Sequence, residues 1–218
     1  MRFSSFYNRR DFLGRISGLS ALAAIFPSRL LGVSEFVKNK FGERMIERYP
    51  PFDDARSKKV IFVAHCIINM NARCNGSGVT PSAMAKIPEF LMKHHIGIIQ
   101  MPCPELGCLG LGREGNIYDQ LSTPGNRKYL RLLAQDIVYQ AKQYMKQDFK
   151  VLGLLGINCS PSCGVDCHMY NGRKPGKGAF MEELTEALKA AGLEMPVIGV
   201  MNAEADKAVA MLEKLDPS

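Results

Sequence analysis

The amino-acid sequence predicts an α/β protein, namely a Rossmann-like open parallel sheet of about four strands with flanking helices in a single domain. The first observation behind this prediction is that short continuous apolar runs alternate with longer apolar runs of helical period. Such alternation is typical of βαβ units around a parallel sheet that is buried on both faces. The second is that the chain has 218 residues, 46% of them hydrophobic, which suffices for one well-packed core.

Four apolar runs are predicted to be strands and four amphipathic runs to be helices, in alternation along the chain. The strands are expected at 60–65, 96–101, 151–157 and 196–201, and the helices at 81–94, 127–147, 178–191 and 203–214. Thr80 and Pro81 suit the N-cap and first position of the first helix, and Gly97 and Gly192 stand where helices are expected to end. Pro88 predicts either a kink in the first helix or a later start.

Two long, glycine-rich connections interrupt this alternation at 102–126 and 160–177. Each of them follows a predicted strand. Long loops inside compact domains are usually functional, and ligands of open parallel sheets bind beyond the carboxyl ends of the strands. We therefore expect functional residues in these connections and at the matching end of the first strand.

The positive charge of the chain is concentrated at its start. The formal net charge is +7, but residues 1–59 contain 12 Lys and Arg against 6 Asp and Glu, and the remaining residues contain 16 against 15. A protein that binds nucleic acid needs a basic surplus on its folded body to neutralise phosphates. The body of this chain lacks such a surplus, so we expect no nucleic-acid partner.

The N-terminal segment resembles a twin-arginine export signal. Residues 8–14 have the sequence Asn-Arg-Arg-Asp-Phe-Leu-Gly, and a short apolar stretch follows at 16–26. This stretch is too short to span a bilayer, which takes about 20 apolar residues. The alternative is an amphipathic N-terminal helix. The resemblance implies the twin-arginine export machinery as a partner, and contact with a membrane only through this segment.

These observations divide the chain into a signal or anchor at 1–32, a tether at 33–57 with one possible short helix at 34–48, and a folded α/β domain at 58–218. Export would place the domain in the periplasm or at the extracytoplasmic face, either free or anchored through the N-terminal segment. If the signal interpretation is wrong, the protein stays in the cytoplasm. The twin-arginine route carries folded proteins, so it is compatible with a cofactor inserted before export.

Cysteines stand at or just beyond the ends of three predicted strands, at Cys66, Cys103 and Cys163. The chain has seven cysteines, an odd number that cannot all pair internally. A single buried cysteine is often only a small hydrophobe. Three thiols that converge at one edge of a sheet favour a centre for a soft metal instead. No Cys-x-x-Cys occurs, which argues against a thioredoxin-like redox pair and against a standard zinc ribbon.

Two polar side chains near these cysteines are candidates for catalysis. Glu105 lies two positions after Cys103, and a carboxylate beside a metal centre is the simplest general acid or base. A salt-bridged loop residue is the alternative for it. Ser162, or in second place Ser160, is a candidate hydrogen-bond partner of a substrate or cluster, although a serine in a tight turn often only caps its own backbone.

Four sequence elements, in this order, resemble the thiouracil desulfidase family and related desulfidases. The elements are His65-Cys66, Arg73-Cys74-Asn75-Gly76, Cys103-Pro104-Glu105 and Ser160-Pro161-Ser162-Cys163-Gly164. The resemblance spans residues 58–201, and the last element is its most specific part. It implies that the α/β domain at 58–218 is desulfidase-like. In that family three cysteines hold a 4Fe-4S cluster and leave one iron open to the sulfur of the substrate. Matched by motif, the ligands here would be Cys66, Cys103 and Cys163.

The resemblance implies an iron-sulfur-dependent desulfidase that removes sulfur, as sulfide, from a small thiocarbonyl compound. An iron without a protein ligand is a Lewis acid, and thiocarbonyl sulfur is a soft donor suited to it. Water, helped by Glu105, would add to the carbon, and Ser162 would hydrogen-bond the substrate or a cluster sulfide. The oxo product would leave without a net redox change.

Two other classes of function remain open at this point. The same thiols suit a non-catalytic carrier of a metal, a cluster or a persulfide, although a carrier has no need for Glu105. A disulfide-stabilised exported binding domain is the other alternative. The additional thiols are candidates for a fourth ligand, a sulfur acceptor or simple packing, and they are Cys74, Cys108, Cys159 and Cys167.

Overall fold

The computed structural model describes residues 52–115 and 117–216. The predicted signal at 1–32, the possible helix at 34–48 and the tether up to residue 51 lie outside the described residues. Residues 52–57 contain neither helix nor strand.

Four parallel strands form the central sheet. They are β1 (Lys59–Val63), β2 (Gly97–Gln100), β3 (Lys150–Ile157) and β6 (Val197–Val200), and their order across the sheet is β2-β1-β3-β6. All three pairings are parallel. The two central strands, β1 and β3, are buried along most of their length, as expected for continuous apolar runs. The predicted α/β fold with a four-stranded, Rossmann-like parallel sheet is confirmed.

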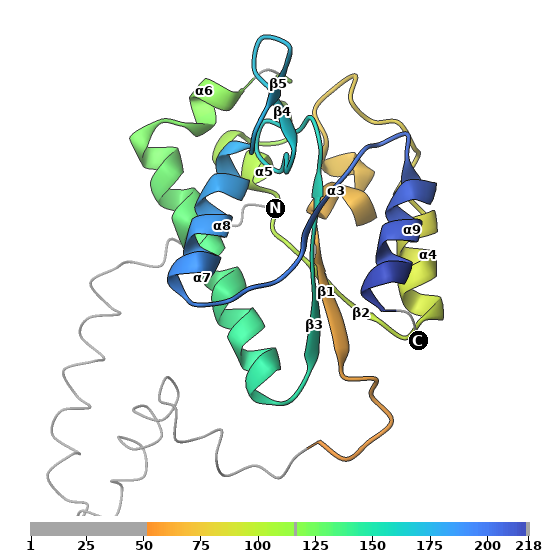
Figure 1. Ribbon diagram of the computed structural model, residues 1–218. Coiled ribbons are helices and arrows are strands. Elements are labelled where there is room, and N and C mark those ends of the chain that lie inside the picture. The colour runs from red at the N-terminus through yellow and green to blue at the C-terminus, as the bar shows by residue number, and fades with distance from the viewer. Residues whose placement is uncertain (1–51, 116, 217–218) are drawn as a thin grey trace, which may run out of the picture. The chain divides into compact units, whose positions relative to one another are not determined.

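Helices cover both faces of this sheet. One face carries α7 (Pro124–Lys146) and α8 (Ala179–Ala190), and the other carries α4 (Lys86–Lys93) and α9 (Ala205–Leu215) (Figure 1). The apolar stripes of the helices meet the sheet in one core, where Phe62, Leu130 and Phe180 are fully buried. Burying a side chain of this size contributes about 2 kcal/mol. This core fixes the strand ends on which the candidate site is built.

The first large helix is shorter than the sequence predicted. It begins at Lys86 rather than at residue 81, so Pro88 is its third residue, a position where the missing N–H has no partner within the helix. Thr80 does not cap it but donates its hydroxyl to the carbonyl of Ala83 in a preceding turn. The left-handed residue after the helix is His95, with φ 56°, whereas Gly97 opens β2. The later start explains Pro88, and the expected role of Gly97 was wrong.

The two long connections contain short elements that the sequence analysis did not anticipate. The elements, together with two that follow β1, are α3 (His65–Ile68), the 3₁₀ turn η2 (Met70–Ala72), α5 (Pro104–Leu109), α6 (Tyr118–Leu121), β4 (Cys167–Met169) and β5 (Arg173–Pro175). None is long enough to show a hydrophobic period. Figure 1 shows α3, α5 and the β4–β5 hairpin gathered at the carboxyl end of the sheet. The first strand was predicted to end at residue 65, but β1 ends at Val63, and His65 is the first residue of α3.

The opposite end of the sheet is held by an ion cluster. Asp216 forms salt bridges with Lys59 Nζ at 2.6 Å and with Lys150 Nζ at 3.1 Å. These two lysines are the first residues of β1 and β3. The side chain of Asp216 is only 4% exposed. This cluster ties the C-terminal end of α9 to the amino ends of the two central strands.

Over the part of the chain that the structure describes, no helix combines the length and apolar character needed to cross a membrane.

Candidate active site

A cavity of about 440 Å³ opens at the carboxyl end of the sheet. Its wall includes all five side chains that the sequence analysis selected, which are Cys66, Cys103, Glu105, Ser162 and Cys163. The expected convergence of the ends of β1, β2 and β3 is thus present in the structure. We call this space the thiol cavity.

Cys66 enters the thiol cavity from the second residue of α3, directly after β1. Its thiol is half-buried, and its Sγ accepts a long hydrogen bond from Nη2 of Arg73 at 3.9 Å. Arg73 is itself fixed, because its Nη1 donates to the carbonyl of Ser77 at 2.9 Å. The arginine of the second sequence element therefore supplies positive charge beside the first candidate ligand.

Cys103 is the N-cap residue of α5, and Pro104 follows at the first helical position. Its Sγ accepts the backbone N–H of Leu106 at 3.4 Å and lies 4.0 Å from Nη2 of Arg113. Both donors favour negative charge on the sulfur. The Pro-Cys-Pro sequence thus presents a thiol at the start of a short helix, aimed into the cavity.

Cys163 lies in the tight turn that follows β3. Ser160 builds this turn, since its Oγ accepts the backbone N–H of Ser162 at 3.2 Å and of Cys163 at 2.9 Å. The turn lies so close to the sheet that a Cβ on Gly156 would stand 2.5 Å from the carbonyl oxygen of Cys163. Only glycine allows this approach. As a result Cys163 is 7% exposed, the most buried of the candidate ligands.

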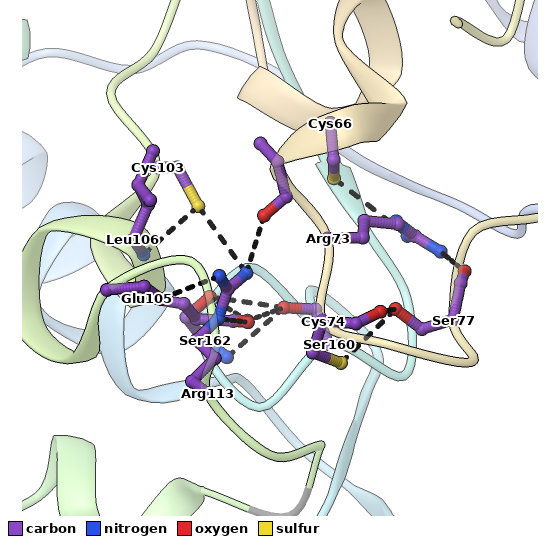
Figure 2. Close-up of polar contacts among 12 residues, drawn as sticks. Cys66, Arg73, Cys74, Ser77, Cys103, Glu105, Leu106, Arg113, Ser160 and Ser162 are labelled. Atoms are coloured by element: carbon purple, nitrogen blue, oxygen red, sulfur yellow. Dashed lines mark hydrogen bonds and ion pairs between the residues drawn. The ribbon is translucent and has the colours of Figure 1, made fainter. Parts of the chain in front are cut away.

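Glu105 joins the second and third of these segments. Its Oε2 accepts a hydrogen bond from Nε of Arg113 at 3.0 Å. Its Oε1 accepts hydrogen bonds from the hydroxyls of Ser160 at 3.0 Å and Ser162 at 2.7 Å. Figure 2 shows the Arg113 guanidinium reaching both Glu105 and Cys103. Glu105 is 9% exposed and Arg113 is 8% exposed. The salt bridge considered as an alternative for Glu105 is present, and it leaves Oε1 directed at the two serines.

Arg113 is a site residue to which the sequence analysis assigned no role. Besides Glu105 and Cys103, it binds the carbonyls of Ala72 at 2.8 Å and Gly110 at 3.1 Å. Its side chain is therefore fully engaged and links η2, α5 and the following loop. The only signal for it in the sequence was that it stands in the same glycine-rich connection as Glu105. Without the fold, this signal is too weak to assign a role.

Burial sets the protonation of the three candidate ligands. It raises the pKa of Cys66, Cys103 and Cys163 above the ordinary thiol value of 9.0, most strongly for Cys163. The Arg73 guanidinium opposes this rise at Cys66, and the Leu106 N–H opposes it at Cys103. The three groups are therefore neutral thiols at neutral pH, and a cationic centre bound by them would displace their protons.

The three candidate ligands form a soft donor set of the kind that binds soft metals and iron–sulfur clusters. In residues 52–115 and 117–216, no group of three or more His, Cys, Asp or Glu side chains is placed to hold a single ion. A 4Fe-4S cluster binds each thiolate through a different iron, so its ligands stand farther apart than those of one ion. The three thiols carry no disulfide and border one cavity. In number and chemistry, these three residues match the ligand set of a cluster with three cysteine ligands.

The remaining thiols fall into different environments. Cys74 borders the thiol cavity and contacts the hydroxyl of Ser77 at 3.2 Å. Cys108, in α5, packs against the core, and burial raises its pKa. Cys159 and Cys167 approach each other, with their Sγ atoms 3.1 Å apart. Burial first, and then the Cys159 thiol, raise the pKa of Cys167, while the charge of Arg173 acts in the opposite direction.

Two further polar side chains border the cavity. Asn202 follows β6, and its Oδ1 is buried without a hydrogen-bond partner among the described residues. His65 bonds Gln100 through Nδ1 at 2.8 Å and Asn69 through Nε2 at 3.3 Å, and burial lowers its pKa. Both ring nitrogens of His65 are thus occupied, whereas Asn202 offers a free acceptor to a ligand.

The fold and this site define an α/β protein with a thiol-rich cavity at the carboxyl end of a parallel sheet. The chain is 32% identical over 162 residues to the uncharacterized protein MJ0003 of Methanocaldococcus jannaschii. The match covers 73% of this chain and 98% of that protein, so the chain belongs to the MJ0003 family. No family model and no solved structure matches it.

Proposed function

We propose that this protein is an iron-sulfur-dependent desulfidase that removes sulfur, as sulfide, from a small thiocarbonyl compound. The observation that carries the proposal is the placement of three disulfide-free thiols, one buried and two half-buried, and a buried carboxylate on the wall of one cavity. The resemblance of the sequence elements to the thiouracil desulfidase family supports it. Cys66, Cys103 and Cys163 would hold a 4Fe-4S cluster, and an iron that lacks a protein ligand supplies a Lewis acid for soft sulfur.

The proposed reaction converts a thiocarbonyl and water into the corresponding oxo compound and hydrogen sulfide, without a redox change. Water must lose a proton as its oxygen adds to the carbon. Glu105 is placed to accept this proton at Oε1, because Arg113 holds Oε2. Ser160 and Ser162 donate to the same Oε1 and keep it oriented toward the cavity.

Asn202 would orient the substrate. Its Oδ1 is a buried acceptor without a partner in the described part of the chain. A ligand that donates a hydrogen bond to such a group satisfies it and thereby stabilises the complex. A thiocarbonyl compound that carries an N–H group would supply this donor. The proposal therefore favours thioamide-like or thiourea-like substrates over simple thioketones.

The test is a comparison of cluster content and turnover in variants of the full chain. Protein purified without oxygen should contain iron and acid-labile sulfide, and Cys66→Ser, Cys103→Ser and Cys163→Ser should each lower both, because a hydroxyl is a poorer ligand than a thiolate. Cys108→Ser is the matched control, since this thiol lies in α5, the helix that Cys103 caps, but packs on the core. Colourless anaerobic protein, or a Cys103→Ser variant with unchanged iron, would contradict the proposal. An iron-loaded protein without turnover of any thiocarbonyl would favour the carrier.

We further propose that the N-terminal segment directs export through the twin-arginine route, since Arg9 and Arg10 precede a short apolar stretch. The route recognises guanidinium groups, for which lysine is a poor substitute. Replacing both residues with lysine should retain the protein in the cytoplasm on cell fractionation. An unchanged distribution would remove the export proposal and leave the site proposal intact.

A further inference from the structure

Two cysteines outside the candidate ligand set form a close thiol pair. Cys159 and Cys167 are both free thiols with Sγ atoms 3.1 Å apart. A disulfide bond is about 2.05 Å long, so closing this pair requires the sulfurs to move by about 1 Å. Cys74, by contrast, contacts a hydroxyl rather than a thiol.

The local backbone holds this pair in place. Cys159 adopts a left-handed conformation, with φ 63°, and its N–H donates to the carbonyl of Cys167 at 2.9 Å. Such a conformation costs a non-glycine residue about 1–2 kcal/mol, so surrounding contacts must maintain it. Asn158 does so, because its Oδ1 accepts the N–H groups of Val165 at 3.1 Å and Asp166 at 3.0 Å.

A glycine lets the loop return to its start. A Cβ on Gly164 would collide with the carbonyl oxygen of Cys167, so a larger residue there would push the two strands of the loop apart. Three features of residues 158–167 therefore bring the thiols together, namely the Asn158 hydrogen bonds, the close approach at Gly164 and the left-handed backbone of Cys159.

The two cysteines differ in their position relative to the thiol cavity. Cys159 is part of the cavity wall, next to the turn that carries Cys163. Cys167 begins β4, and the positive charge of Arg173 acts on it. A small nucleophile released in the cavity would thus meet Cys159 first and displace Cys167.

We propose that Cys159 and Cys167 form a dithiol–disulfide pair whose disulfide captures sulfide in the thiol cavity as a persulfide on Cys159. This inference rests on the proposed function for the source of the sulfide, and it assigns a sulfur acceptor to the same cavity. It adds a covalent sulfur site to the candidate cluster site.

The chemistry balances in two exchange steps. In the first, a low-molecular-weight disulfide such as oxidised glutathione accepts two electrons and two protons, which joins the two protein sulfurs and releases two glutathione thiols. In the second, hydrosulfide attacks Cys159 Sγ, the bond between the protein sulfurs breaks, and Cys167 leaves as a thiolate. The product is Cys159 bearing one additional sulfur and its proton.

The first step is tested by treating the anaerobically purified full chain with oxidised glutathione and alkylating the remaining thiols. Cleavage before Asp166 separates the peptide of Cys159 from that of Cys167, so the disulfide should hold the two peptides together until reductant is added. Cys163 lies on the Cys159 peptide, and therefore Cys159→Ser must abolish the link. Cys167→Ser should instead trap glutathione on Cys159. Peptides that separate without reductant, or a link that survives Cys159→Ser, would overturn the proposal.

The second step is tested by adding sodium sulfide to the oxidised protein and measuring the mass of each alkylated peptide. One sulfur atom should be added on Cys159, with at least tenfold less on Cys74, and Cys74→Ser should behave as the parent protein. An intact disulfide, or equal addition to Cys74, would overturn sulfide capture. Because sulfide is supplied directly, the result does not depend on desulfidase activity. Capture of sulfide by a protein that turns over no thiocarbonyl would remove the proposed function and leave this site standing.

Discussion

Ser162 donates a hydrogen bond of 2.7 Å to Oε1 of Glu105, and this contact joins residues 57 positions apart in the sequence. The first residue belongs to the turn after β3 and the second to α5 after β2. Ser162 is 1% exposed and also lies 3.5 Å from the sulfur of Cys163. One hydroxyl thus connects the candidate proton acceptor to a candidate ligand, and the variants below separate these roles.

Glu105→Gln should lose activity and also stability. The amide keeps the shape of the side chain but cannot accept a proton, so turnover of a thiocarbonyl should fall roughly 10²-fold or more while iron content is retained. Arg113 would then be a buried cation without its counter-charge, which costs about 3–5 kcal/mol of unfolding free energy. Arg113→Met combined with Glu105→Gln removes both charges and should recover part of the stability but none of the activity. Urea denaturation, iron analysis and steady-state kinetics measure the three quantities.

Full activity in Glu105→Gln would show that another group handles the proton. A stability equal to that of the parent protein would show that Arg113 finds a different partner. Either result would contradict the arrangement described above.

Ser162→Ala and Ser160→Ala should differ in kind. The Ser162 hydroxyl bonds the carboxylate, and a hydrogen bond to a charged group is worth about 1.5–3 kcal/mol, so its loss should slow turnover about tenfold or more at constant iron content. Ser160 also accepts the N–H groups of Ser162 and Cys163, so its loss should loosen the turn and lower iron content. Iron content and turnover rate are measured in parallel for both variants. An equal loss of iron in both would contradict the separate roles assigned to the two serines.

Asn202→Ala should weaken substrate binding without slowing the chemical step. Loss of one neutral hydrogen bond of about 1 kcal/mol should raise KM roughly fivefold and leave kcat nearly constant. A fully N-methylated substrate analogue, which has no N–H left to donate, is the matched control and should give the same KM with both proteins. If the variant instead raised KM for both compounds, Asn202 would act through packing.

The sequence was sufficient for the architecture because buried parallel strands and amphipathic helices leave strong periodic patterns, as in β3 and α8. It was also sufficient to place Cys66, Cys103 and Cys163 together, since residues after parallel strands share one edge. It could not show Arg113 at Glu105, or Cys159 at Cys167. These contacts depend on loop conformations that are set by short elements and single backbone torsions, which have no periodic signal.

Asp216→Asn should separate the stability of the fold from the integrity of the site. Asp216 binds Lys59 and Lys150 at the amino end of the sheet, away from the thiol cavity. Removing its charge leaves the 21%-exposed Lys59 without this carboxylate, and the free energy of unfolding should fall by about 1–2 kcal/mol. Iron content and turnover should not change below the unfolding transition. A loss of iron in the folded variant would mean that the two ends of the sheet are coupled.

Closure of the Cys159–Cys167 pair should depend on pH in a defined direction. Thiol–disulfide exchange proceeds through the thiolate, and the pKa of Cys167 is raised above 9.0 by burial and by the Cys159 thiol. Below that pKa the thiolate fraction of Cys167 rises about tenfold for each pH unit. When Cys167 is the thiol that first attacks oxidised glutathione, the rate of closure should therefore rise by up to tenfold from about pH 7 to about pH 8. The rate is measured by trapping the remaining thiols at intervals.

Arg173→Gln should slow this reaction at a fixed pH, because the positive charge that favours the Cys167 thiolate is removed. Lys174→Gln is the matched control. It removes the same charge from the next residue of β5, whose side chain points to the other face of the hairpin, opposite His168 rather than Met169. An equal slowing by both variants would indicate that only the net charge matters, and a rate independent of pH would show that neither thiol of the pair attacks as the thiolate in the limiting step.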